Sequence, residues 1–388
     1  MIVWVVLAAA SGEVAAQGPR FKLGPAIEVG RHHTFTQVLV AALGPDNRLA
    51  VSQPQDYSVL LFDLARPDSP VAVLGRRGQG PGEFSEPGGI GWIGKTLWVA
   101  DRGRPRVEVF DPSGKVVASK FYDAPRSSSR VLRYIGPTAL MRDSTVVYYP
   151  VVIGTIRDPA VFPEDPSFPV LLLRHQAPKA DTIAQLRLLR GQLALRGDRH
   201  GGAVSGIASQ PFSNLNFFHS GADGRRVLLV IQSEPESHEG RALVKVVSPT
   251  GAEIYRKVLG LPPRAVSNSE WDSLVTSWAK VYASDTWSTE QKARAGLREV
   301  LIRPKFHPLV SAAVLGRDGT VWLRLEHEHN RLATWLILSP EGKDLGSVDI
   351  PRGIRVMDAT ATRVVGVNTD SDDVDHVVWM AVLGHSSM

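Results

Sequence analysis

The stretch PGGIGWIGKTLWVADRGRPRVEVFDPSGKVVASKF, residues 87–121, decides the fold of this chain. Within it, residues 106–110 alternate between apolar and polar side chains, which predicts a strand with one buried face. Residues 111–114, Asp-Pro-Ser-Gly, predict a tight turn, because proline presets φ and glycine accepts a positive φ. The apolar segments on either side complete a set of four short antiparallel strands, which is one blade of a β-propeller.

The same arrangement of strands and turns recurs along the chain. Clear copies cover residues 222–251 and 314–342, and looser copies cover 44–63, 131–174 and 359–383. Repeats of this length are typical of propellers and solenoids, and all-β units with two turns each favour the propeller. We therefore expect an all-β fold, a six-bladed β-propeller that forms a single domain over residues 17–388.

A glycine-rich stretch, GRRGQGPGEF at residues 75–84, precedes the first repeat described above. Together the two resemble one NHL-type repeat, and the whole chain resembles exported bacterial six-bladed propeller proteins of NHL/TolB-like architecture. The resemblance implies a fold rather than a reaction. The glycine-rich stretch lacks the Lys-Ser/Thr pair of a phosphate-binding loop, so we interpret it as a connection between blades.

The composition is that of an ordinary globular protein, with 43% hydrophobic and 21% charged residues among 388. The net charge of +5 weakly favours anionic partners. The densest basic stretch, residues 187–200, contains no aromatic residue, which argues against nucleic-acid binding. The absence of cysteine excludes disulfides, thiolate metal sites and cysteine nucleophiles. No later segment has the length of a membrane span, and we expect a monomer.

The N-terminal residues predict export. Residues 2–10 form an apolar run too short to span a bilayer, and the small residues Val14 and Ala16 fit signal-peptidase cleavage before Gln17. We expect a signal peptide over residues 1–16 and a periplasmic or secreted protein. The strand expected near residues 21–29 has no blade of its own, so we predict that it pairs with residues 377–383 and closes the ring.

Residues 264–303 interrupt the β pattern with helical signals. Residues 267–270 and 288–291 both fit a capping box, and apolar residues follow each at helical spacing. This predicts a helical insertion between the fourth and fifth blades. Its apolar stripe either packs on the propeller or forms a lid or docking element for a partner.

One face of a propeller carries the loops between the second and third strands, and ligands usually bind there. The residues that we expect on this ligand-binding face are His32, His33, Asp101, Arg102, Glu326, His327, His329 and Asn368. In an extended segment, His327 and His329 point to the same side and could chelate a metal such as Zn²⁺, with a third ligand from His32, His33 or His307. The alternative is a solvated loop tip.

A calcium site is a further alternative, because oxygen ligands suit Ca²⁺. Asp101, Glu326, Asn368 and Asp370 could supply those ligands. However, Asp101 could instead accept hydrogen bonds from the loop that follows it, and residues 370–373 fit a simple turn. No nucleophile elbow supports a hydrolase triad, so no catalytic residue is assigned.

Two functions follow from these observations. The first is a binding scaffold that presents its polar face to a protein, a peptide or a glycan, with no membrane span. The second is a metal-dependent hydrolase or lyase with Ca²⁺ or Zn²⁺ in the central channel. Fold alone does not decide between them.

Overall fold

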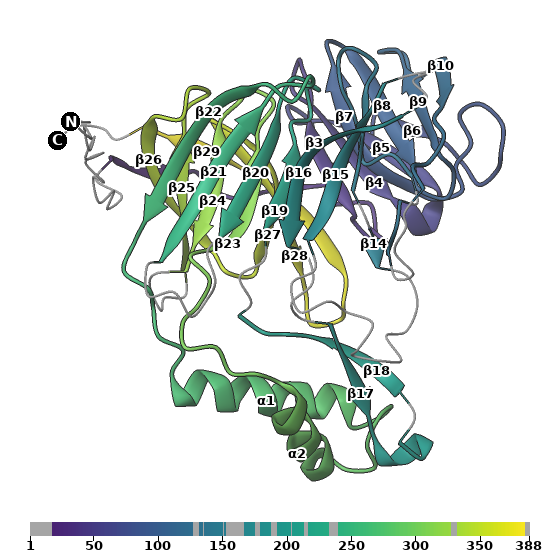
Figure 1. The fold of residues 1–388 in the computed structure, drawn as a ribbon. Helices are drawn as coiled ribbons and strands as arrows, with labels where there is room; N and C mark the ends of the chain where they lie inside the picture. Colours follow the sequence, from purple (N-terminus) through teal and green to yellow (C-terminus); the bar gives the residue numbers. More distant parts are fainter. Residues whose placement is uncertain are drawn as a thin grey trace, which may run out of the picture.

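The computed structural model shows an all-β, propeller-like fold with few helices (Figure 1). It describes residues 18–126, 132–134, 136–149, 151–152, 167–174, 179–187, 192–202, 204–212, 216–232, 240–326 and 332–384. The predicted signal peptide, residues 1–16, lies outside this part of the chain. No helix among the described residues is long and apolar enough to cross a membrane.

Four antiparallel sheets of four strands follow one another along the chain. The first contains β3 (Val40–Leu43), β4 (Arg48–Gln53), β5 (Ser58–Asp63) and β6 (Ala72–Leu74). The second contains β7 (Pro87–Ile93), β8 (Thr96–Asp101), β9 (Arg106–Phe110) and β10 (Val116–Phe121). The third contains β12 (Ala139–Leu140), β13 (Val146–Tyr148), β15 (Ser167–Leu173) and β16 (Asp181–Arg187). The fourth contains β19 (Phe217–Ser220), β20 (Val227–Gln232), β21 (Arg241–Val247) and β22 (Glu253–Gly260).

A nine-stranded sheet completes the set, and we call this sheet together with the four sheets above the body. One half holds β23 (Val310–Leu315), β24 (Val321–Leu325), β25 (Leu332–Leu338) and β26 (Asp344–Pro351). The other half holds β27 (Ile354–Thr360), β28 (Arg363–Thr369), β29 (Asp375–Leu383) and β2 (Ile27–Val29). The N-terminal strand β1 (Arg20–Leu23) joins the halves, because it pairs with both β26 and β29.

The innermost strands of these units adjoin one another. Strand β3 lies against β7, β7 against β12, β19 against β23, β23 against β27, and β27 against β3. The two turns that precede β13 and β20 also meet, since the Arg142 N–H donates to the Gly224 carbonyl at 2.9 Å. The units are therefore arranged around a shared axis, as in a propeller.

The turns form as the sequence predicts. Gly114 has a φ of 85°, and its N–H donates to the Asp111 carbonyl at 2.9 Å. The Asp111 carboxylate also accepts from the Ser113 N–H at 2.9 Å. Equivalent turns end at Gly251, Gly319 and Gly342, each with a positive φ. Glycine is required at these positions because the left-handed conformation is unfavourable for most other residues.

The predicted pairing of the N-terminal strand with the last strand is confirmed. Lys22 lies opposite Leu383 in β29, and the Ile27–Val29 strand lies opposite residues 377–379. Val29 is fully buried. This pairing joins the two ends of the described chain and covers one edge of β29.

The glycine-rich stretch is a connection between β6 and β7, as predicted. The Phe84 N–H donates to the Arg76 carbonyl at 2.8 Å, and the Gly78 N–H donates to the Phe84 carbonyl at 3.1 Å. Phe84 is fully buried between the first and second sheets, with its ring 6.2 Å from that of Phe110. The aromatic side chain therefore anchors the loop to the core.

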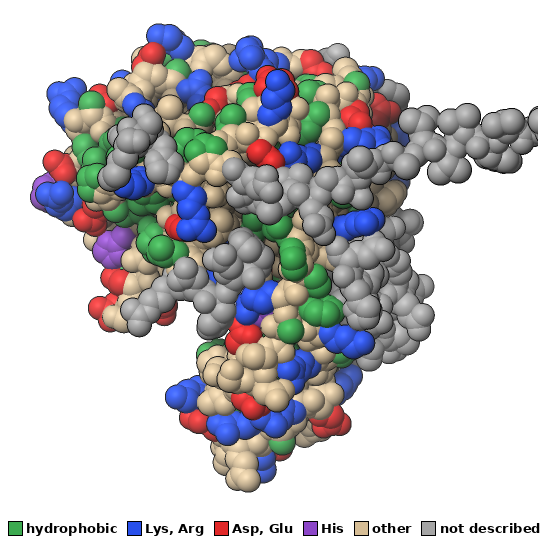
Figure 2. Space-filling view, turned by 90° about the vertical axis from the view of Figure 1, so that its left-hand side faces the viewer, with side chains coloured by type: hydrophobic (Ala, Val, Ile, Leu, Met, Phe, Trp, Pro, Cys, Tyr) green, Lys and Arg blue, Asp and Glu red, His purple; other side chains and the backbone are tan. Residues whose placement is uncertain are grey.

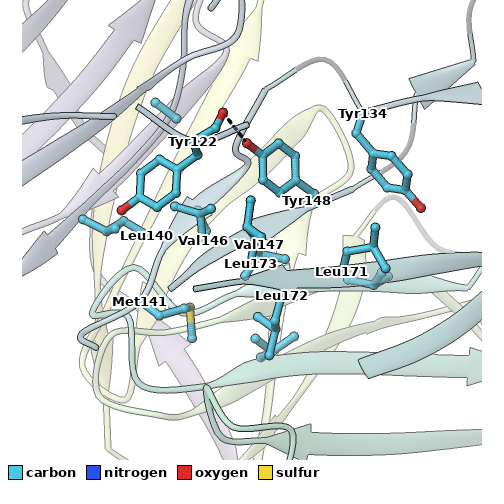
Figure 3. Packing of buried hydrophobic residues seen from close by; sticks show 14 of the residues in the cluster. Tyr122, Tyr134, Leu140, Met141, Val146, Val147, Tyr148, Leu171, Leu172 and Leu173 are labelled. Carbon is cyan, nitrogen blue, oxygen red and sulfur yellow. Dashed lines mark hydrogen bonds between the residues drawn. The ribbon is translucent and has the colours of Figure 1, made fainter. Parts of the chain in front are cut away.

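The core of the third sheet holds three tyrosines whose hydroxyls are satisfied by backbone oxygens (Figure 3). Tyr148 donates to the Tyr122 carbonyl at 3.3 Å, and Tyr134 donates to the Pro169 carbonyl at 2.8 Å. Burial raises the pKa of Tyr134 to about 12. These bonds let a polar group remain in an apolar core.

Two helices, α1 (Asn268–Tyr282) and α2 (Glu290–Val300), lie between β22 and β23 in the chain. Ser267 begins α1 with the predicted capping box, in which Ser267 and Glu270 bond each other's backbone. The second predicted box is wrong, because the helix begins one position later and its cap is a single bond, from the Lys292 N–H to Thr289 Oγ1. Thr289 caps α2, and Ser288 instead bonds the Asp198 carboxylate.

The helices pack on a hairpin rather than on the sheets of the body. The hairpin comprises β17 (Gln192–Arg196) and β18 (Val204–Ser209), and the turn between them includes a 3-10 helix at residues 198–200. Trp271, Val275 and Ala279 of α1 share one apolar cluster with Leu195 and Ala208 of the hairpin. We call these four elements the helix–hairpin unit. It projects from the body as a separate lobe whose surface carries many Lys and Arg side chains (Figures 1 and 2).

Three short elements complete the described structure. Strands β11 (Leu132–Arg133) and β14 (Val151–Val152) pair with each other, and a 3-10 helix covers Pro54–Asp56. None of them contributes to the site described next.

Candidate ligand site

A cavity of about 500 Å³ lies where the innermost strands meet. Its wall is formed by residues of β3, β7, β19 and β27 and by the segment that precedes β12. Most of the wall is apolar, and Tyr149 and Phe218 stack on each other within it, with ring centres 5.6 Å apart. A cavity of this size and character is typical of sites for small ligands.

The direction of the strands gives the cavity two different ends. Leu39 and Pro137 lie just before β3 and β12, and Arg102 lies just after β8, so these residues mark one end. Ala222 and Asp358 lie at or near the far ends of their strands and mark the other. We call the first end the mouth and the second the floor.

Hydrogen bonds between different units cross-link the floor. The Trp92 N–H donates to the Ala222 carbonyl at 2.7 Å. The Leu43 N–H donates to the Asp358 carboxylate at 2.7 Å, and the Leu315 N–H donates to His219 Nδ1 at 3.3 Å. Two titratable side chains thus hold backbone groups of adjoining strands.

Asp358 is 3% exposed and lies at an irregular register between β27 and β28. Its second oxygen accepts from the Ala359 N–H at 2.8 Å. Burial raises the pKa of this carboxyl to about 7, although the two backbone donors oppose the rise and nearby Asp318 adds to it. Near neutral pH the carboxyl therefore exists in both protonation states.

His219 lies in β19 and lines the cavity. Burial lowers the pKa of the imidazole to about 4. The ring is therefore neutral at pH 7, and Nδ1 acts as the acceptor for Leu315. That assignment leaves the proton on Nε2.

Arg102 is the predicted face residue that reaches the cavity. Its stem crosses the start of β7, where a Cβ on Gly88 would lie 2.3 Å from Arg102 Cγ. Gly136 leaves room for the Arg102 backbone, because a Cβ at position 136 would lie 3.2 Å from Arg102 Cα. Arg102 Nη1 lies 3.5 Å from the Glu86 carboxylate, and the side chain is 38% exposed.

Asp101 lies beside Arg102, but its role is structural. It is fully buried, and its carboxylate accepts from the Ser85 and Glu86 N–H groups, at 3.1 and 2.9 Å. It also pairs with the buried Arg106 at 3.1 Å. The carboxylate is a hydrogen-bond acceptor for a loop, as predicted, but the prediction of the loop after β8 is wrong, because the donors lie in the loop before β7.

Glu326 is held by three partners. Ser311 Oγ donates to it at 2.8 Å, Arg352 Nη1 lies 2.9 Å away and Arg324 Nε 3.1 Å away. Burial alone would raise the pKa of this carboxyl, but the Ser311 hydrogen bond and the two arginines outweigh burial, so the pKa lies below its usual value. The side chain is therefore a charged member of a network.

His307 occupies the contact between α1 and the body. Its ring lies 4.5 Å from that of Phe212, and Nε2 lies 3.4 Å from the Glu270 carboxylate. Burial and the neighbouring Arg264 keep the pKa of His307 below its usual value. Arg264 in turn donates to the Glu326 carbonyl at 3.1 Å, which links the helix–hairpin unit to β24.

The remaining predicted residues lie apart from the cavity. His33 Nε2 lies 3.3 Å from Gln53 Nε2, and His32 and Asn368 are exposed. Asp370 accepts from the Asp372 and Val374 N–H groups and forms a turn, as predicted. His327 and His329, the expected metal ligands, lie outside the described residues.

The sequence did not identify His219 or Asp358. Both lie inside apolar strands, in the runs FFHS and VMDA, while the predicted site residues were sought in loops. The signal that could have found them is an ionisable residue in the first strand of a repeat, because that strand faces the axis of a propeller.

No family model matches the chain, and no curated protein matches it. Among solved structures, it is similar to a member of the DUF4221 family from Bacteroides vulgatus, with a TM-score of 0.48, 8% identity, and coverage of 94% of this chain and 98% of that chain. The chain is also similar to an exported protein from Bacteroides fragilis, with a TM-score of 0.41, 8% identity, and coverage of 94% of this chain and 96% of that chain. A third similar structure is the calcium-binding protein regucalcin from Agrobacterium tumefaciens, with a TM-score of 0.38, 10% identity, and coverage of 94% of this chain and 96% of that chain. The propeller-like class of this protein rests on its own strand pairings.

Proposed function

We propose that this chain is an exported six-bladed β-propeller that acts as a binding protein and takes a small ligand in its central cavity. The four separate sheets and the two halves of the nine-stranded sheet would each be one blade. The N-terminal signal and the single domain over residues 17–388 belong to the same proposal.

The observation that carries the binding function is the cavity itself. It has about 500 Å³ of space, a largely apolar wall and a few polar groups at defined positions. Its floor is cross-linked by hydrogen bonds between different units, so the space is preformed. Preformed sites lose less conformational entropy when a ligand binds.

Filling the cavity tests this function. Thr138 lines the cavity and is half-buried. Its side chain forms no hydrogen bond with the described residues, so the Thr138→Phe variant loses none of those bonds. We expect octanol, an uncharged apolar probe, to bind the wild-type protein with a stoichiometry near one in calorimetry. We expect the Thr138→Phe variant to lose this binding, because the phenyl ring takes up the space.

Thr362→Phe is the matched control, since Thr362 is exposed in the turn between β27 and β28. It should bind octanol like the wild type. If neither octanol nor its anionic analogue octanoate binds the wild-type protein, or if Thr138→Phe binds octanol with unchanged affinity, the cavity is not a ligand site and the proposed function is wrong.

A further inference from the structure

Arg102 gives the cavity a chemical preference. It is the cationic side chain among the described residues that line the space, and it stands at the mouth. The glycines at 88 and 136 leave room for its stem and backbone. A Cβ at position 88 would collide with the Arg102 stem, at 2.3 Å from Cγ, and a Cβ at position 136 would lie tightly against the Arg102 backbone, at 3.2 Å from Cα.

The guanidinium is only partly neutralised. Its ion pair with Glu86 is 3.5 Å long, and both side chains are partly exposed, at 38% and 46%. An exposed pair of this kind is weak, whereas a planar guanidinium binds a carboxylate or phosphate through two parallel hydrogen bonds. Arg102 can therefore exchange Glu86 for an anion on a ligand.

The rest of the wall offers mostly apolar surface. Trp98 lines the cavity and is 2% exposed, and Phe218 and Tyr149 stack on each other within the wall. Burial of an apolar ligand body against this surface is favourable. The Asp358 carboxylate oxygens already accept from the Leu43 and Ala359 N–H groups, so they are satisfied within the floor.

We propose that the ligand of this cavity is an amphipathic anion, with an oxyanion head that pairs with Arg102 at the mouth and an apolar body that lies along Phe218, Tyr149 and the strands of the wall. This inference rests on the proposed function, because it concerns the same cavity. A carboxylate and a phosphate monoester share the relevant chemistry, and the experiment separates them.

The test compares octanoate with octanol, which have similar apolar bodies and differ in charge. We expect octanoate to bind the wild-type protein more tightly than octanol. In Arg102→Gln, we expect the affinity for octanoate to fall by about tenfold, the usual effect of losing a hydrogen bond to a charged group. The affinity for octanol should stay unchanged, and Arg102→Lys should retain part of the preference.

Arg256→Gln is the matched control, because Arg256 is an exposed arginine on the outer strand β22 that pairs with Glu253. Its affinity for both probes should equal that of the wild type. Gly88→Ala gives a second route, since it keeps the guanidinium but displaces the stem; it should weaken octanoate and spare octanol. Octyl phosphate in place of octanoate shows which head group Arg102 prefers.

The outcomes separate the two proposals. If octanol and octanoate bind with equal affinity, and neither Arg102→Gln nor Gly88→Ala changes this, the cavity binds ligands but the anionic preference is wrong. If neither probe binds the wild type, the proposed function fails and this inference fails with it.

Discussion

Arg106 shows how one buried side chain can organise a loop. The side chain is 1% exposed and lies between the carboxylates of Asp101 and Glu108, at 3.1 and 3.0 Å. Its guanidinium also donates to the Gln79 and Gly80 carbonyls, each at 3.0 Å. The glycine-rich connection between β6 and β7 is therefore fixed by a cation from β9.

Replacing this cation should cost much more than replacing an exposed one. In Arg106→Met, the two buried carboxylates lose their counter-charge, and we expect the free energy of unfolding to fall by about 3–5 kcal/mol. Urea denaturation at neutral pH measures the loss.

Arg76→Met is the matched control in the same loop. Arg76 is 80% exposed and pairs with Glu83 at 2.9 Å, so its loss should cost less than about 1 kcal/mol. Equal losses in both variants would show that the buried arrangement of Arg106 contributes little.

His219 and Asp358 should give the stability of the protein two opposing dependences on pH. The pKa of Asp358 is higher in the fold than in the unfolded chain, so its stabilising contribution is complete below about pH 4 and is lost as the pH rises to about 7. The pKa of His219 is lower in the fold, so stability is lost as the pH falls from about 6.5 to about 4.

Single variants should separate the two effects. Between pH 4.5 and 6.5, the slope of the free energy of unfolding against pH should be more positive in Asp358→Asn than in the wild type. In His219→Gln, the same slope should be more negative than in the wild type. Each slope should differ from the wild-type slope by up to about 1.4 kcal/mol per pH unit, the value for one proton. Urea midpoints measured across this range provide the slopes, and three parallel profiles would contradict the assignment.

At the scale of elements, the helix–hairpin unit has a core of its own. Trp271, Trp287 and Leu297 are buried there with residues of the hairpin. The polar links are also internal to the unit, since Asp198 accepts from the Ser288 N–H and Arg199 donates to the Trp287 carbonyl. Among the described residues, Arg264 links α1 to the body, since it pairs with Glu270 and donates to the Glu326 carbonyl.

This separation predicts local rather than global loss of structure. Truncating a buried aromatic residue costs about 3–5 kcal/mol of stability, and in Trp271→Ala we expect this loss to be confined to the helix–hairpin unit. Hydrogen exchange should increase in the hairpin and in both helices, while the strands of the nine-stranded sheet keep their protection.

Val281→Ala on the same helix is the control, because Val281 is 67% exposed. It should leave exchange unchanged throughout. If Trp271→Ala instead increases exchange in every sheet, the unit and the body unfold together.

At the scale of the molecule, the N-terminal strands join distant parts of the chain. Strand β1 pairs with β26 and β29, and Val29 of β2 is fully buried against residues from the other end of the chain. The pairing covers an edge that would otherwise be exposed to other chains.

Removing residues 18–29 together with the preceding segment should therefore destabilise the whole body. Loss of the buried Val29 contact alone should cost about 2 kcal/mol, and the lost strand pairing adds to it. We expect a lower midpoint in thermal unfolding and a tendency to associate, measured by light scattering. A chain that begins at Gln17 is the control, and an equal midpoint for the two chains would show that the N-terminal pairing is dispensable.

The sequence by itself determined the strands of the second sheet, the turns and the partner of the N-terminal strand. Alternation with a period of two and the Asp-Pro-Ser-Gly type of turn are local properties, so they can be identified without the fold. The pairing of residues 21–29 followed from the need to cover a free strand edge. The same reasoning identified the cap at Ser267 and the acceptor role of Asp101.

Only the tertiary structure decided what these elements contact. An apolar stripe on α1 indicates burial but not its partner, which is the hairpin. The cavity depends on which innermost strands adjoin, so His219 and Asp358 gain their altered pKa values from neighbours that are distant in the sequence. Arg102 was expected on the ligand-binding face, but its access to the cavity depends on two glycines of other segments, and such long-range contacts leave no local pattern.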